Sequence, residues 1–183
     1  MALMNDDRRY GAVAKSLHWA AAAQVIVLFL LGWTMTELPL GAEKFEQYNL
    51  HKSFGFTVLV FMACRLVWRV ISPPPPPPDD LPRNTQLMAK LGHATLYLIV
   101  FAQGVVGLVH SWSANFPVIV FGRFTLQNLT PPNEPLKEFL AAVHYWGGWL
   151  LLLLVAGHIG AALFHHFIRK DPVLRRMIPW GRM

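Results

Sequence analysis

The sequence has few charged residues and a single cysteine, and both scarcities exclude classes of protein. Charged side chains make up 14% of the 183 residues, whereas hydrophobic side chains make up 54%. A water-soluble domain of this length needs more charge to cover its surface. The one cysteine, Cys64, excludes an internal disulfide and any site built from several cysteines. We expect Cys64 to lie in the protein core.

The apolar residues are gathered into four runs, each long enough to cross a bilayer as a helix, which takes about 20 residues. They cover residues 16–35, 50–71, 87–112 and 139–168. A helix forms the hydrogen bonds of its backbone N–H and C=O groups within itself, as lipid requires, so we expect all four runs to be helices. Six prolines, Pro73 to Pro78, predict a stiff polyproline II strap between the second and third runs, with an SH3-type ligand as the alternative. The sequence therefore predicts an all-α, integral membrane four-helix bundle that forms one domain, residues 1–183.

Lysine and arginine are distributed unevenly between the two ends of this predicted bundle. The N-terminus also lacks a signal-cleavage pattern, so the first apolar run is expected to remain as an anchor. The formal charge of +6 does not indicate nucleic-acid binding, because the basic residues flank apolar runs. Lys/Arg-rich segments face the cytoplasm, which predicts that both termini are cytoplasmic. Twelve of the sixteen cations lie on the side of the termini: Arg8, Arg9, Lys15, Arg65, Arg69, Arg83, Lys90, Arg169, Lys170, Arg175, Arg176 and Arg182.

Two histidines of the fourth run have a spacing that suits two stacked metal centres. His144 and His158 are 14 residues apart, which on a helix is about 40° in direction and about 21 Å along the axis. One helix thus presents two imidazoles to the same side at two depths. Haem iron accepts imidazole as an axial ligand, and two imidazoles per iron leave no open position. The pattern predicts two b-type haems, one near each side of the membrane.

Each of these histidines needs a partner from another helix at the same depth. His18 lies near the cytoplasmic start of the first helix, and His51 lies near the outer start of the second. We therefore predict that His51 and His144 bracket an outer haem, and that His18 and His158 bracket an inner one.

The histidines of the third run do not fit this pattern. His93 and His110 are 17 residues apart, about 260° around a helix, so they cannot serve two haems on one face. We interpret His93 as an interhelical hydrogen-bonding residue and His110 as an interfacial one.

Three further polar residues are candidates for function near the predicted haems. Arg65 suits a propionate of the inner haem, and Lys52 suits the outer haem or an anion arriving from outside; snorkelling to the interface is the alternative for both. His165 follows His158 by seven residues, so it lies on nearly the same face and about 10 Å nearer the cytoplasm. An imidazole there can hydrogen-bond a quinone carbonyl and deliver a proton. An interfacial histidine is the alternative.

With these residues in view, the chain resembles the bacterial dihaem cytochrome b561 family. The resemblance extends from about Arg8 to about Pro179, and all four predicted ligand positions match the family pattern. The segments that carry it, besides His144 and His158, are Ser16-Leu17-His18-Trp19, His51-Lys52-Ser53-Phe54-Gly55, Arg65-Leu66-Val67-Trp68-Arg69, Leu91-Gly92-His93-Ala94, His165-His166-Phe167 and Asp171-Pro172-Val173-Leu174-Arg175-Arg176-Met177.

The resemblance implies bis-histidine haems and quinone chemistry in the bacterial inner (plasma) membrane. Some family members look like superoxide oxidases, which pass an electron from superoxide outside through both haems to ubiquinone. Cations at the outer side can attract the superoxide anion. However, the outer segments also carry glutamates, so an electrostatic funnel is not evident. The outer cations are Lys44, Lys52, Arg123 and Lys137, and the glutamates are Glu37, Glu43, Glu46, Glu134 and Glu138.

Two other functions remain open at this point. A cytochrome b that carries electrons between the quinone pool and a redox partner protein has every feature named so far. A haem-free, histidine-rich metal transporter is the third hypothesis. The 14-residue histidine spacing and the scarcity of carboxylates within the apolar runs count against a transporter, because divalent-metal pathways usually use carboxylates.

Overall fold

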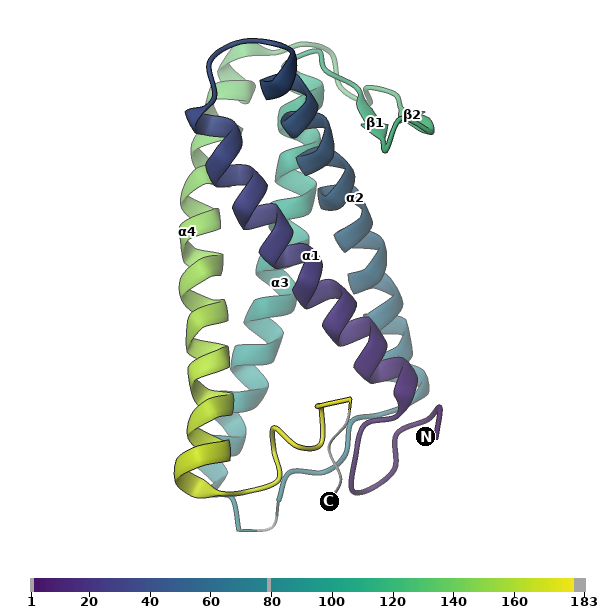
Figure 1. The fold of residues 1–183 in the computed structure, drawn as a ribbon, viewed down its shortest axis with the longest axis vertical. Helices are drawn as coiled ribbons and strands as arrows, with labels where there is room; N and C mark the ends of the chain where they lie inside the picture. Colours follow the sequence, from purple (N-terminus) through teal and green to yellow (C-terminus); the bar gives the residue numbers. More distant parts are fainter. Residues whose placement is uncertain (1, 79, 180–183) are drawn as a thin grey trace.

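The computed structural model describes residues 2–78 and 80–179, so the predicted cytoplasmic cation Arg182 lies outside the described residues. Four long helices make up most of the described structure: α1 (Ala12–Glu37), α2 (Ala42–Ile71), α3 (Arg83–Ser113) and α4 (Glu134–Phe164). Figure 1 shows them extending from one end of the molecule to the other, with α1 crossing diagonally in this view. Each is long and apolar enough to cross a membrane. The predicted helical membrane bundle is confirmed.

The helices extend beyond the apolar runs that predicted them. Helix α2 begins at Ala42 rather than near Leu50, because its first turns, with Glu43 and Glu46, continue the helix outside the hydrocarbon region. Helix α4 begins at Glu134, where the Asn133 side chain accepts a hydrogen bond of 2.9 Å from the backbone amide of Leu136. This N-cap satisfies an amide that the first turn of a helix leaves without a partner.

The helices pack in chain order. Helix α1 packs against α2, α2 against α3, and α3 against α4, whereas α4 makes no comparably close backbone approach to α1 or α2 within the described ranges. A small apolar core joins the four helices: Ala21, Val58, Met62, Val100 and Leu151.

Cys64 lies on the exposed surface of α2, so its predicted place in the core was wrong. A membrane helix is apolar toward lipid as well as toward its neighbours. An apolar setting therefore does not identify the buried face.

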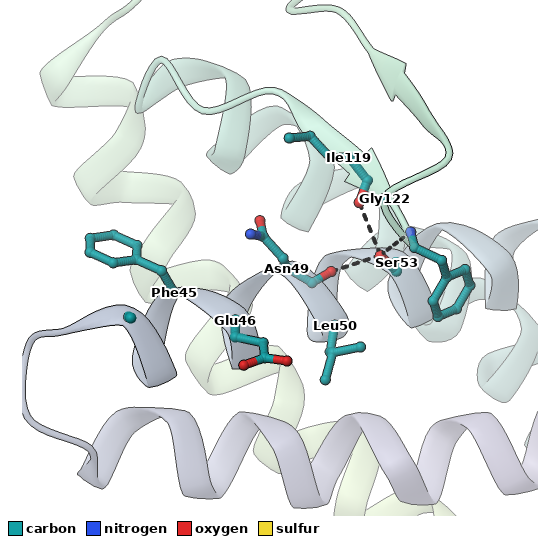
Figure 2. A pocket seen from close by; sticks show the side chains of 9 residues that line it. Phe45, Glu46, Asn49, Leu50, Ser53, Ile119 and Gly122 are labelled. Atoms are coloured by element: carbon teal, nitrogen blue, oxygen red, sulfur yellow. Dashed lines mark hydrogen bonds between the residues drawn. The ribbon is translucent and has the colours of Figure 1, made fainter.

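A β-hairpin that the sequence did not predict covers one end of α2. Strands β1 (Val118–Val120) and β2 (Phe124–Leu126) pair antiparallel with Val118 opposite Leu126. The side chain of Ser53 on α2 joins the hairpin to the bundle, as Figure 2 shows. Its single hydroxyl proton is shared between the carbonyl oxygens of Asn49, at 2.7 Å, and Ile119, at 3.1 Å, and its Oγ accepts a hydrogen bond of 2.9 Å from the Phe121 amide. We call this end of the molecule the hairpin end.

Both terminal segments lie at the opposite end, which we call the terminal end (Figure 1). The Asn5 side-chain amide donates hydrogen bonds to the carbonyl oxygens of Ser72 and Pro73. These two hydrogen bonds tie the N-terminal segment to the proline strap. The C-terminal segment is held by Lys15, whose Nζ lies 3.0 Å from the Ile178 carbonyl oxygen. These contacts close the terminal end with chain from three regions of the sequence.

Candidate functional site

The predicted outer histidines face each other near the hairpin end. The rings of His51 on α2 and His144 on α4 have centroids 6.1 Å apart and planes 85° apart. Glycines of the other two helices lie against these rings. A β-carbon at Gly32 would lie 3.5 Å from Cε1 of His51, and one at Gly107 would lie 3.1 Å from Cε1 of His144. The approach at Gly107 is tight, so a β-carbon there would require the His144 ring to shift by a few tenths of an ångström.

The predicted inner histidines also face each other, nearer the terminal end. The ring centroids of His18 on α1 and His158 on α4 are 6.3 Å apart, with planes 68° apart. His93 on α3 lies beside the same ring, with its centroid 5.3 Å from that of His158. The structure thus brings three histidines together at this depth, one more than the predicted pair.

Both predicted pairs fit the axial positions of a haem iron. Two imidazole–metal bonds of about 2.0–2.1 Å, plus about 1.2 Å from each ligating nitrogen to its ring centroid, separate the centroids by about 6.4–6.6 Å. The pairs at 6.1 and 6.3 Å are slightly shorter than this value. The His93–His158 separation of 5.3 Å is too short. Over the described ranges, no three His, Cys, Asp or Glu side chains gather to bind a metal ion directly. The pairs therefore suit an iron whose remaining ligands come from a porphyrin.

The surroundings of these imidazoles agree with that fit. The Nδ1 atoms of His18, His51 and His144 are buried and have no hydrogen-bond partner among the residues described. Buried polar atoms of this kind are rare in folded proteins and require an explanation such as a missing ion or group. In each pair, a histidine of α4 faces a histidine of α1 or α2. The backbone of α4 does not approach the backbones of those two helices closely. A flat group can lie where helix backbones stay apart.

Arg65 lies at the depth of the His18–His158 pair. It follows His51 by 14 residues on α2, so it lies about 21 Å closer to the terminal end on nearly the same face. Its guanidinium group lies over the ring of Tyr97, 5.2 Å from the centroid. No carboxylate of the described chain forms an ion pair with Arg65. A partly buried cation of this kind suits an anionic group such as a haem propionate.

Lys52 holds the loop that leads into the hairpin. Its Nζ donates to the Pro117 carbonyl oxygen at 3.2 Å and lies 5.9 Å from the centroid of the Phe116 ring. A carbonyl oxygen does not neutralise an ammonium group. Lys52 therefore keeps its positive charge one residue away from His51.

His165 begins a π-helical turn, η1 (His165–Arg169), that follows α4 at the terminal end. Its Nδ1 lies 2.5 Å from Oδ2 of Asp171. Sequence reasoning did not identify Asp171 as a partner of His165. The only signal was an isolated carboxylate within a cationic stretch, just after the helix end.

A pocket of about 470 Å³ between α2 and the hairpin is a separate feature. Figure 2 shows Glu46, Asn49 and Ser53 on the α2 face that lines it. These residues point about 140–200° away from His51 around the helix. The pocket therefore does not open onto the histidine pairs.

Comparison with known proteins agrees with the geometry. Residues 9–180 match the family model for prokaryotic cytochrome b561. The chain is 36% identical over 179 residues to cytochrome b561 homolog 2 of Escherichia coli (strain K12), covering 97% of this chain and 95% of that relative. It is 30% identical over 182 residues to cytochrome b561 homolog 1 of the same organism, covering 93% and 97%. A probable superoxide oxidase, CybB, of Yersinia pestis is 28% identical over 178 residues, covering 96% and 98%. The chain belongs to the prokaryotic cytochrome b561 family, whose members are b-type haem membrane electron carriers.

Proposed function

We propose that this chain binds two haems and transfers electrons across the bacterial inner membrane, from superoxide at the outer face to ubiquinone at the inner face. The observation that carries the proposal is the presence of two facing imidazole pairs at two depths of one bundle. His51 and His144 hold one haem, and His18 and His158 hold the other. His93 lies too close to His158 to replace His18.

The haems supply reversible one-electron transfer at two levels of the membrane. With two imidazoles held for each haem, the iron would have no open position, so an electron donor would not need to bind to iron. The two imidazoles of α4 lie about 21 Å apart along the helix axis. This separation places one pair toward each face of a hydrocarbon core about 30 Å thick.

The charge distribution supports an orientation for this transfer. Twelve of the sixteen lysines and arginines belong to the side of the termini, so the terminal end faces the cytoplasm. The hairpin end then faces outward. His51 and His144 lie on the side of the electron donor, and His18, His158 and His165 lie on the side of the quinone.

Superoxide as the donor has two lines of support. A relative that is similar over nearly the whole chain has the name probable superoxide oxidase. In addition, Lys52 follows His51 on α2 and carries a positive charge at the hairpin end, where its hydrogen-bond acceptor among the described residues is the Pro117 carbonyl oxygen. A fixed cation beside an electron-accepting site raises the encounter rate of a small anion, and salt reduces the effect.

Stopped-flow mixing of the purified protein with superoxide tests this function. We expect rapid haem reduction, followed by oxidation of the haems on addition of ubiquinone. Lys52→Gln should slow the first step several-fold at low salt, by the roughly 1 kcal/mol of a screened charge interaction. Lys44→Gln is the matched control, because it removes the same charge seven residues, about 10 Å, further along α2 from His51. There the Lys44 Nζ contacts the carbonyl oxygens of Thr36 and Leu38. If superoxide leaves the haems oxidised and only a donor protein reduces them, the chain is a carrier between that protein and the quinone pool.

A further inference from the structure

The end of α4 folds back so that Asp171 contacts His165 twice. The Asp171 amide donates to the His165 carbonyl oxygen at 3.2 Å, and the Asp171 carboxylate lies 2.5 Å from Nδ1 of the same histidine. The π-helical turn widens the helix end, and Lys170 takes a left-handed conformation with φ of 57° that reverses the chain. Turns of the π type occur often at functional sites.

The Asp171 carboxylate is buried and well supplied with donors. Only 7% of the residue is exposed. Its oxygens accept hydrogen bonds from the Val173 amide at 3.1 Å and from Nε of Arg169 at 3.2 Å, besides the contact with His165. Burial acts to raise the pKa of Asp171, but the hydrogen bonds from His165, Val173 and Arg169 outweigh it and lower the pKa below its usual value. The carboxylate is therefore charged at neutral pH.

This charge fixes the state of the His165 ring. A carboxylate accepts hydrogen bonds and cannot donate them, so Nδ1 carries a proton and Nε2 is left to exchange the second one. Nε2 has no hydrogen-bond partner among the described residues. The charged groups around the pair are Arg169, on the same carboxylate, and Asp80 of the strap, 3.9 Å from Arg169. His166, the next residue of the π-helical turn, packs edge-on against Phe167, with ring centroids 4.7 Å apart.

We propose that Asp171 is the positioning residue that holds His165 with Nε2 free, so that His165 passes protons to a quinone bound at the terminal end. This inference rests on the proposed function, which supplies the quinone. Quinone becomes quinol by taking up two electrons, one from each of two donor molecules, and two protons. His165 gives a proton from Nε2 to the quinone carbonyl oxygen that it faces and regains one from water on the cytoplasmic side, while Nδ1–H stays bound to Asp171. The other carbonyl oxygen takes its proton from water on the same side.

The C-terminal segment is held in place independently of Asp171. Trp19 donates from Nε1 to the Met177 carbonyl oxygen at 3.0 Å, and Arg176 donates to the Pro76 carbonyl oxygen at 2.6 Å. Lys15 binds the Ile178 carbonyl oxygen in the same way. Asp171→Asn therefore leaves three anchors intact. Arg176→Gln is the matched control, because it removes one anchor and leaves the His165–Asp171 contact in place.

The test measures the ring state and the quinone reaction separately, in the full-length protein with its haems. Nitrogen-15 NMR of the reduced protein reports which ring nitrogen of His165 carries the proton, and His165→Gln assigns the signal. We expect Nδ1–H in the wild type and in Arg176→Gln, and a mixture of both tautomers in Asp171→Asn. After reduction of the haems with dithionite, oxidation by ubiquinone should be at least about tenfold slower in Asp171→Asn. Haem reduction by the donor should be unchanged.

The possible failures can be told apart. If Asp171→Asn retains the wild-type ring state and rate of oxidation by quinone, Asp171 does not position His165. An equal loss of rate in Arg176→Gln assigns the effect to the C-terminal segment as a whole and also overturns the inference. If the wild-type haems are not oxidised by quinone at all, the proposed function fails together with the inference, whatever the NMR spectrum shows.

Discussion

Replacing Gly107 by alanine should loosen the His51–His144 pair and leave the His18–His158 pair unchanged. A β-carbon at position 107 would lie 3.1 Å from Cε1 and 3.5 Å from Nδ1 of His144. Non-bonded carbon atoms pack best at about 3.5–4.0 Å. The His144 ring must therefore retreat by roughly 0.5 Å, away from the position in which it faces His51.

The size of the effect follows from the cost of turning a side chain. A side chain turned about 30° from its preferred rotamer costs about 0.5–1.5 kcal/mol, which is about a two- to tenfold weaker haem affinity at this pair. Gly32→Ala is the matched control. The β-carbon it adds would lie 3.5 Å from Cε1 of His51, which is an ordinary van der Waals contact.

Titration of the apoprotein with haem measures this affinity. The titration is best done with the His158→Ala variant, because the only haem it retains should be the one between His51 and His144. In that background Gly107→Ala should weaken haem binding two- to tenfold, and Gly32→Ala should leave it unchanged. Equal losses for the two alanine variants, or a normal affinity with Gly107→Ala, would refute the argument that the close approach at Gly107 positions His144.

Three further predictions test other parts of the molecule. Arg65→Gln should lower the reduction potential of one haem, by the equivalent of about 1–2 kcal/mol, because a nearby cation favours the reduced state; a redox titration in which both potentials stay constant would exclude Arg65 from that site. Ser53→Ala should leave the Phe121 amide without its partner, at a cost of about 1–3 kcal/mol to the docked hairpin. Faster hydrogen exchange at that amide, with α2 unchanged, is the expected result. The lowered pKa of Asp171 means that its stabilisation is complete above the usual value of 3.8 and is lost as the pH falls through the lowered pKa. Protection of the Val173 amide, which donates to this carboxylate, from hydrogen exchange should therefore persist down to about pH 4 and be lost below it. Loss of that protection near pH 6 would contradict this assignment.

The sequence was sufficient for the parts of the structure that depend on long regular helices. Four apolar runs predicted four helices. The 14-residue spacing of His144 and His158 placed both rings on one side of α4, where the structure has them facing His51 and His18. That spacing is informative because a helix has a fixed rise and turn per residue. The roles of these histidines as haem ligands stay a prediction.

The parts that the sequence did not reveal depend on contacts between distant segments. The hairpin consists of two three-residue strands, and its turn places Phe121 at a positive φ of 46°, which no local preference of phenylalanine predicts. Its position depends on Ser53, far away in the sequence. The return of Asp171 onto His165 likewise depends on a π-helical turn and on the left-handed Lys170. Cys64 was misplaced because a helix that is apolar on all sides gives no periodic signal for its buried face.

The most direct test of the central claim is the haem content of single histidine variants. Difference spectra of the purified protein, reduced minus oxidised, should show two b-type haems per chain in the wild type. His144→Ala and His158→Ala should each retain one, and the two retained haems should differ in reduction potential. His93→Ala should retain both, because its ring lies too close to His158 for the two to bind one iron between them. Two haems retained in His144→Ala or His158→Ala, or one lost from His93→Ala, would contradict the assignment of the facing pairs.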